Sequence, residues 1–203
     1  MKGKMLLGLT AILMLTGAAV PVKADDVWKF DAQRFVLKEY TGTETDVVVP
    51  DTMDEGVPVK RLGTQLLAGS ETLTSVVVPD SVTILDVGAL SYDNNLSEIT
   101  LSSNLINIGW NAISSNDALT ELTIPASVCI IDSYAVSGCY ALKKIVFEGA
   151  CPLIGSEAFV MLSDDVVIYV PDDQIEEYKK VFEENNKNLN IQPSGKPAVL
   201  YSA

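Results

Sequence analysis

The sequence repeats itself with a period of about 23 residues. The segment LTSVVVPDSV begins at Leu73, and similar segments begin at Leu96, Leu119 and Leu142. A unit of this length cannot bury its apolar side alone, so consecutive units must stack and share one continuous core. The period therefore predicts a solenoid in which each repeat forms one coil.

Several columns of the repeat are apolar in all four units. With the four leucines as position 1, these columns are positions 4, 6, 10, 13, 17 and 18. Positions 4 and 6 alternate with outward residues, as a short half-buried strand requires, and the equal spacing makes successive strands parallel. Repeats of about 20–29 residues with leucine at fixed sites form the leucine-rich class, so the predicted fold is a β-rich leucine-rich-repeat solenoid.

Two further columns predict where the chain turns. Position 7 holds proline in several units, which ends the strand because proline cannot donate to a ladder. Position 14 holds glycine or aspartate, which suits a turn that needs relaxed backbone geometry. The residues at position 14 are Gly63, Asp86, Gly109, Asp132 and Gly155.

The repeats occupy residues 44–174, in units that start near residues 44, 73, 96, 119, 142 and 165. The first unit carries six extra residues, around Met53 to Lys60. Because the ends of a solenoid expose core, each end needs a cap. We expect residues 25–43 to form an N-terminal β cap of two short strands. Its apolar residues are Trp28, Phe30, Phe35 and Leu37.

At the other end, residues 172–185 predict a C-terminal capping helix. Asp172 or Asp173 suits its N-cap, because an acidic start complements the helix dipole. Its apolar stripe is Ile175, Tyr178, Val181 and Phe182. Residues 186–203 are expected to be a polar, loosely ordered tail, of which Val199 to Tyr201 can dock back.

The detailed motif is that of a known family. LTELTIPASVCIIDSYAVSGCYAL resembles the unit of the BspA-like leucine-rich repeat family, whose motif is L-x-x-I-x-I-P-x-S-V-x-x-I-G-x-x-A-F-x-x-C. The strongest matches are VPDSV from Val78, IPASV from Ile124 and IGSEAF from Ile154. The motif's Phe survives only as Phe159 and its Cys only as Cys139. The resemblance implies a bacterial exported or surface protein, some of whose relatives act as adhesins.

Residues 1–24 are typical of a secretory signal peptide. Two lysines near the start precede an apolar run from Met5 to Val20, and small residues precede a cleavage site after Ala24. The alternative, a membrane helix, needs about 20 apolar residues, and the run is shorter than that. We therefore expect a secreted or cell-surface-associated protein, with no membrane contact once the signal is removed.

Charge and composition limit the classes of partner and activity that the chain can have. The chain has 14 basic and 27 acidic residues, a net charge of −13, so it repels nucleic acid and anionic membranes. It has no histidine, the usual general base and imidazole ligand, and no phosphate-binding loop. We expect no enzyme activity, no cofactor and no metal. We expect a monomer that binds an unknown protein partner.

The cysteines leave an alternative open. Cys129, Cys139 and Cys151 are an odd number in an exported chain, which permits one disulfide and a free thiol, or a disulfide to another chain. Cys129 and Cys151 are neighbours in adjacent units, but they occupy successive positions, 11 and 10, whose side chains tend to point oppositely. Three reduced thiols are the favoured interpretation. The resemblance implies that Cys139 is a buried, unpaired cysteine.

A candidate binding face follows from the strand alternation. Positions 3 and 5 point away from the core and stack into a ladder, and solenoids bind partners on extended surfaces of this kind. Its middle is acidic, which suits a basic or hydroxyl-rich partner. The alternative interpretation is a plain sheet surface of β-branched residues. Position 3 contributes Asp46, Ser75, Glu98, Glu121 and Lys144, and position 5 contributes Val48, Val77, Thr100, Thr123, Val146 and Tyr169.

The favoured function is a protein-binding or adhesion module that uses this face. One alternative is a structural surface or spacer protein without a specific ligand. A further alternative is a carbohydrate-binding protein, for which Tyr169 and Trp110 would be the aromatic platforms.

A second candidate surface lies at position 12, where Ile84, Ile130 and Leu153 are apolar. With Trp110 and Tyr134 nearby in register, they form either an exposed patch or residues buried by an irregular turn.

Overall fold

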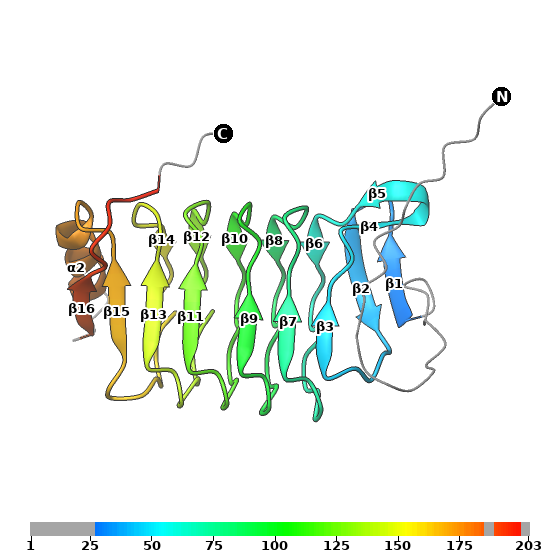
Figure 1. Ribbon diagram of the computed structural model, residues 1–203, viewed down its shortest axis with the longest axis horizontal. Coiled ribbons are helices and arrows are strands. Elements are labelled where there is room, and N and C mark those ends of the chain that lie inside the picture. The colour runs from blue at the N-terminus through cyan, green and yellow to red at the C-terminus, as the bar shows by residue number, and fades with distance from the viewer. Residues whose placement is uncertain (1–26, 185–188, 200–203) are drawn as a thin grey trace.

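The computed structural model describes residues 27–184 and 189–199. It is an elongated stack of coils, as the repeat predicted (Figure 1). The hairpin of β1 (Trp28–Asp31) and β2 (Val36–Tyr40) lies at one end, and α2 (Ile175–Glu184) with β16 (Asn190–Pro193) lies at the other. The signal peptide expected for residues 1–24 lies outside the described residues. None of the helices in the described ranges has the length and apolarity that a membrane span requires.

The first strand of each coil lies on the predicted face, and we call the outward surface of these strands the strand face. These strands pair in parallel with the equivalent strands of neighbouring coils, so that Val47 lies opposite Val76 and Leu122 opposite Ile145. The ladder divides into a sheet β3-β7-β9 and a sheet β11-β13-β15-β16. The strands are β3 (Asp46–Val48), β7 (Ser75–Val77), β9 (Glu98–Thr100), β11 (Glu121–Ile124), β13 (Lys144–Phe147) and β15 (Val167–Val170).

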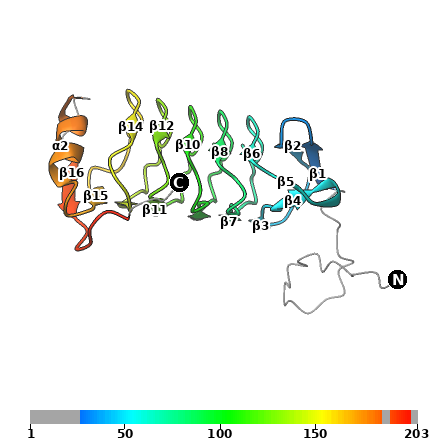
Figure 2. The ribbon, with the colours of Figure 1, turned by 90° about the horizontal axis from the view of Figure 1, so that it is seen from above.

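A second strand per coil forms the other long sheet, in the order β1-β2-β6-β8-β10-β12-β14. Figure 2 shows this sheet and the strand face as separate layers of the stack. The repeat strands of this sheet cover positions 12 and 13 and are only two residues long, too short for any alternation to be visible in the sequence. They are β6 (Arg61–Leu62), β8 (Ile84–Leu85), β10 (Asn107–Ile108), β12 (Ile130–Ile131) and β14 (Leu153–Ile154).

The core lies between these layers and consists of the predicted apolar columns. In one coil Val76, Leu85, Ala89 and Leu90 are fully buried, and their equivalents in the neighbouring coils are buried or nearly so. Each buried aliphatic side chain contributes about 1.5–3 kcal/mol before the entropy of ordering is subtracted. The extra residues of the first coil form β4 (Thr52–Met53), a 3-10 turn (Asp54–Gly56) and β5 (Val57–Pro58).

The explanation predicted for position 14 is wrong. None of the position-14 glycines has a positive φ. Instead, a Cβ on Gly109 would lie 2.6 Å from the Leu85 carbonyl oxygen of the preceding coil, so glycine there permits close approach of two backbones. In the regular part of the coils, the residues with positive φ lie at positions 16 and 20. These are Gln65, Gly88, Asn111, Tyr134 and Glu157 at position 16, and Gly69, Tyr92, Ser115, Gly138 and Met161 at position 20.

The N-terminal strands form where they were expected, with one correction. Trp28 and Leu37 are buried and Phe30 is partly buried. Phe35 is not part of the core: it is 42% exposed and has a φ of 56° in the turn before β2, and Val36 is buried instead. That this hairpin serves as a cap stays a prediction.

The C-terminal helix has the predicted apolar stripe. Tyr178 and Phe182 are buried, with ring centroids 4.9 Å from Phe147 and 5.6 Å from Phe159 respectively. Ile175 and Val181 are half-buried. The role of α2 as a cap stays a prediction.

Neither aspartate caps α2 as expected. Asp172 Oδ1 accepts a hydrogen bond from the Gly195 N–H, and Asp173 Oδ1 accepts one from the Ala198 N–H, each at 2.8 Å. The two carboxylates therefore hold the following segment of chain rather than the helix. Residues 190–199 are accordingly ordered, where a loose tail was expected, and this expectation is wrong for them.

Within this tail, β16 pairs in parallel with β15, with Ile191 opposite Ile168. The spacing is again one period of the repeat, so β16 occupies the place of one more repeat strand although its sequence is polar. Val199 docks back, because its N–H donates to the Glu148 carbonyl at 2.8 Å. Tyr201 lies outside the described residues.

Candidate functional site

The residues predicted to face outward lie on the strand face. Each strand shows the expected alternation, as in β9, where Glu98 and Thr100 are exposed and Ile99 between them is buried. Val48 is 59% exposed at the N-terminal end of the face. The eleven predicted residues are exposed except four that are half-buried: Ser75, Lys144, Val146 and Tyr169. Their role in binding stays a prediction.

Of the four charged residues among the eleven, Asp46, Glu98 and Glu121 are acidic, and Lys144 in the fifth coil is basic. Asp46 accepts hydrogen bonds from Ser75 Oγ at 2.6 Å and from Thr74 Oγ1 at 3.1 Å, and these bonds hold its pKa below the ordinary value. Glu121 and Lys144 form an ion pair of 2.9 Å between adjacent coils. An exposed pair of this kind contributes at most about 1 kcal/mol, so both groups remain available to a partner. Glu98 has no ion pair among the described residues.

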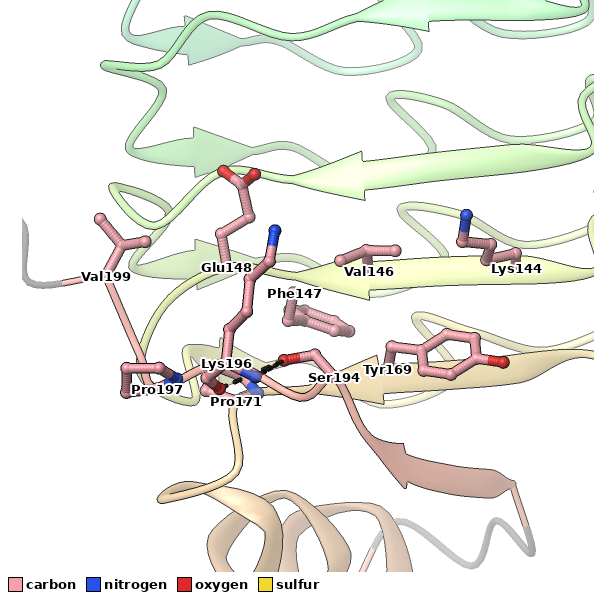
Figure 3. A pocket seen from close by; sticks show the side chains of 10 residues that line it. All are labelled: Lys144, Val146, Phe147, Glu148, Tyr169, Pro171, Ser194, Lys196, Pro197 and Val199. Carbon is pink, nitrogen blue, oxygen red and sulfur yellow. Dashed lines mark hydrogen bonds between the residues drawn. The ribbon is translucent and has the colours of Figure 1, made fainter.

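The C-terminal end of the face contains a pocket (Figure 3). Its volume is about 330 Å³, and it lies between β13, β15 and residues 194–199, which we call the strap. The predicted residues Lys144, Val146 and Tyr169 form part of its lining. Sequence analysis missed the remainder, which is Phe147, Glu148, Pro171, Ser194, Lys196, Pro197 and Val199.

A signal for the missed residues was present in the period. Val167 begins β15, and Asn190, one period later, begins β16. Continuing the repeat by one more strand would have placed residues after Pro193 beside those after Val170. The polar composition of 190–196 concealed this continuation.

Hydrogen bonds fix the strap to three parts of the chain. The Ser194 N–H donates to the Val170 carbonyl at 2.8 Å, and the Asp172 N–H donates to the Lys196 carbonyl at 2.9 Å. The bonds from Gly195 to Asp172, from Ala198 to Asp173 and from Val199 to Glu148 complete the attachment. The wall of the pocket is therefore already in place before any ligand arrives.

The second candidate surface is an exposed patch on the other sheet. Leu153 is 74% exposed and Trp110 is 47% exposed, while Ile84 and Ile130 are half-buried. The rings of Trp110 and Tyr134 meet edge to face, with centroids 6.2 Å apart. These residues lie on or beside strands β8, β10, β12 and β14, so the patch is separate from the strand face.

Two of the three cysteines are buried or partly buried thiols. Burial raises the pKa of Cys139 to about 11 and that of Cys151 to about 12, so both are protonated thiols near neutral pH and poor nucleophiles. Cys129 is exposed, and all three are free thiols. In the parts of the chain that the structure describes, no three histidine, cysteine or acidic residues are grouped to hold a metal ion.

Several solved structures resemble the chain. A leucine-rich repeat protein from Bacteroides capillosus is 36% identical and covers 56% of this chain and 86% of its own, with a TM-score of 0.49. The leucine-rich repeat protein TpLRR of T. pallidum is 20% identical and covers 88% of this chain and 99% of its own, with a TM-score of 0.50. The pneumococcal vaccine antigen PcpA is 16% identical and covers 89% of this chain and 49% of its own, with a TM-score of 0.58.

No curated protein matches the sequence. TpLRR and PcpA show the shared fold. The family is decided by the sequence model of the BspA type leucine rich repeat region, which matches six copies over residues 60–190. This range is well over half of the 203 residues, and the chain therefore belongs to the BspA-type leucine-rich repeat family.

Proposed function

We propose that this chain is an exported protein-binding module of the adhesion type, which contacts its partner through the strand face. The observation that carries the proposal is the regularity of this face, on which the outward residues of three successive coils lie in register in each of its two sheets. Solenoids offer such extended surfaces to partners. Export rests on the signal peptide predicted for residues 1–24, and the description of the fold relative PcpA as a vaccine antigen accords with it.

The charge of the face selects the partner's chemistry. Asp46, Glu98 and Glu121 make the first coils acidic, so the surface opposite them on the partner should be basic or rich in hydroxyl groups. We infer further that the chain is not an enzyme, because the sequence lacks histidine and its family is built of binding repeats. A monomer suffices for this role.

A binding screen with a paired variant tests the proposal. Residues 25–203 would be screened against extracellular-matrix proteins and a glycan array at physiological salt. A saturable protein hit should be lost in the double variant Glu98→Lys with Glu121→Lys. The matched control is Glu183→Lys with Glu184→Lys on α2, which changes the net charge equally on an exposed helix and should leave binding intact. Unchanged binding in the Glu98 and Glu121 double variant would exclude the strand face as the binding surface.

A carbohydrate-binding role is the second candidate, because exposed aromatic rings occur at two places. Tyr169 lines the pocket, and Trp110 lies in the patch on the other sheet. A glycan hit lost in Trp110→Ala or Tyr169→Ala would favour this role. Absence of binding to both the proteins and the glycans would favour a structural spacer.

A further inference from the structure

We propose that the pocket beneath the strap binds an apolar side chain and the acidic residue next to it, in an extended segment of the protein partner. The proposal rests on the proposed function, because the pocket opens on the strand face, and it names the kind of segment that the C-terminal end of that face receives. Three features of the pocket support it.

The first feature is that the pocket is preformed. Five hydrogen bonds of 2.8–2.9 Å attach the strap to β13, to the end of β15 and to the two aspartates before α2. Ordering a loop on binding opposes association, and a wall that is already fixed avoids this cost. The pocket can therefore hold a short segment although it is small.

The second feature is the apolar lining. Val146 and Phe147 come from β13, Pro171 follows β15, and Pro197 and Val199 come from the strap (Figure 3). The volume of about 330 Å³ is at the lower end of the range of ligand sites, which leaves room for a side chain and adjoining backbone.

Few polar groups in the strap remain for a sugar. Its N–H groups at residues 194, 195, 196, 198 and 199 already donate within the chain, and Ser194 Oγ donates to the Lys196 carbonyl at 3.3 Å. Sugar hydroxyls placed over Val146, Pro171 and Pro197 would lack partners, which costs more than it gains. A peptide side chain fits this lining better.

The third feature is the local charge. Lys196 is exposed, and its ammonium group has no ion pair among the described residues. Lys144 lies at the other side of the pocket and pairs only with Glu121, while Glu148 is the one acid in the lining. Because Lys144 is paired with Glu121, Lys196 is the cation that is available to an acidic residue of the segment.

The strand spacing adds a register to the proposed segment. Adjacent strands are about 4.8 Å apart, and an extended chain rises about 3.3 Å per residue. Glu98 lies two coils from Lys144, and β9 and β11 between them are in contact without being paired, so a segment crossing the strands covers that distance in roughly three residues. A basic residue about three positions from the acidic one would therefore lie over Glu98.

Capped synthetic peptides test the pocket without the natural partner. Peptides Gly-Ser-Leu-Glu-Ser-Gly and Gly-Ser-Phe-Glu-Ser-Gly would be titrated into the ¹⁵N-labelled protein, with amide signals followed by NMR. We expect saturable shifts at Val146, Phe147, Ser194 and Val199, with dissociation constants on the order of 1 mM. Replacing the apolar residue of the peptide by Ser, or its Glu by Lys, should weaken binding about tenfold.

Variants with matched controls locate the binding. Val146→Glu and Lys196→Glu should each weaken peptide binding about tenfold. Val48→Glu, in the same column of the first coil, and Lys180→Glu, exposed on α2, should change it less than about twofold. Lys196→Glu alters an exposed side chain, so it remains informative even where Val146→Glu fails to fold.

Three results would overturn the proposal. They are the absence of saturable shifts at these amides, equal binding of the Ser-substituted or Lys-substituted peptides, and stronger binding of maltoheptaose at the same amides. Loss of partner binding in the Glu98 and Glu121 double variant is measured separately. A result that refutes peptide binding in the pocket is therefore distinguished from one that refutes partner binding on the strand face.

Discussion

The side-chain Oδ1 of Asn116 accepts a hydrogen bond of 3.0 Å from the backbone N–H of Asp93, one coil earlier in the stack. Both residues belong to a largely buried polar ladder at position 21, which also contains Ser70 and Cys139. Asp93 Oδ1 continues the ladder by accepting the Ser70 N–H at 2.6 Å. Its Oδ2 is buried without a hydrogen-bond partner in residues 27–184 and 189–199, and burial raises the pKa of Asp93 to about 7.

This carboxyl should make stability depend on pH. Because the pKa of Asp93 is higher in the folded chain than the ordinary value of 3.8, the folded chain binds this proton more tightly than the unfolded chain. The contribution of Asp93 to stability is therefore most favourable at acidic pH, decreases as pH rises from about 4 to about 7, and is then constant.

Asp93→Asn tests this effect. Asn116 Nδ2 donates to the Leu90 carbonyl at 2.9 Å and the Ile113 carbonyl at 3.0 Å, and an amide at residue 93 can donate in the same way. We expect the variant to be more stable by about 2 kcal/mol at pH 8 and close to the parent at pH 4.5 in urea unfolding. The exposed Asp164→Asn is the control. An equal difference at both pH values would contradict the assignment.

Gly109→Ala should be more destabilising than substitution of a left-handed glycine. A Cβ at residue 109 would meet the Leu85 carbonyl oxygen, so the two coils must separate, at a cost of about 2–3 kcal/mol. Gly69 has a φ of 75° and open space around it, and Gly69→Ala should cost about 1 kcal/mol through backbone strain alone. Urea midpoints of both variants measure the difference, and the reverse order would refute the close-approach explanation.

Removing the two carboxylates before α2 should loosen the strap. Asp172→Ala with Asp173→Ala deletes the acceptors of the Gly195 and Ala198 N–H groups. We expect hydrogen exchange at those two amides to become about tenfold faster, since each bond contributes about 1 kcal/mol. Asp164→Ala with Asp165→Ala, which removes two exposed acids nearby, is the control. Unchanged exchange at Gly195 and Ala198 would show that other contacts hold the strap.

Tyr178→Phe should weaken the docking of α2 to a modest extent. The Tyr178 hydroxyl donates to the Gly149 carbonyl at 3.2 Å and to the Ala150 carbonyl at 3.3 Å, both in the loop after β13. Its loss should lower stability by about 1–2 kcal/mol in thermal unfolding, because a buried acceptor loses its partner. Tyr140→Phe, at an exposed tyrosine, should change stability by less than about 0.5 kcal/mol.

Much of the fold follows from the repeat. Val76 is fully buried and Val77 is exposed, as period-two alternation requires, and Leu85 and Ala89 are buried in their columns. The outward placement of Glu98, Glu121 and Tyr169 follows by the same argument. The strands at positions 12 and 13 could not be predicted from the repeat, because a strand of two residues shows no periodicity.

The sequence by itself therefore determined the stack of coils, the core columns and the face that each strand turns outward. Each of these depends on contacts between equivalent residues, and a regular spacing of residue types records such contacts directly. The tertiary structure alone decided the pocket, the partners of Asp172 and Asp173, and the strand at Asn190–Pro193. These contacts join unlike segments where the apolar pattern has ended, so no periodicity records them.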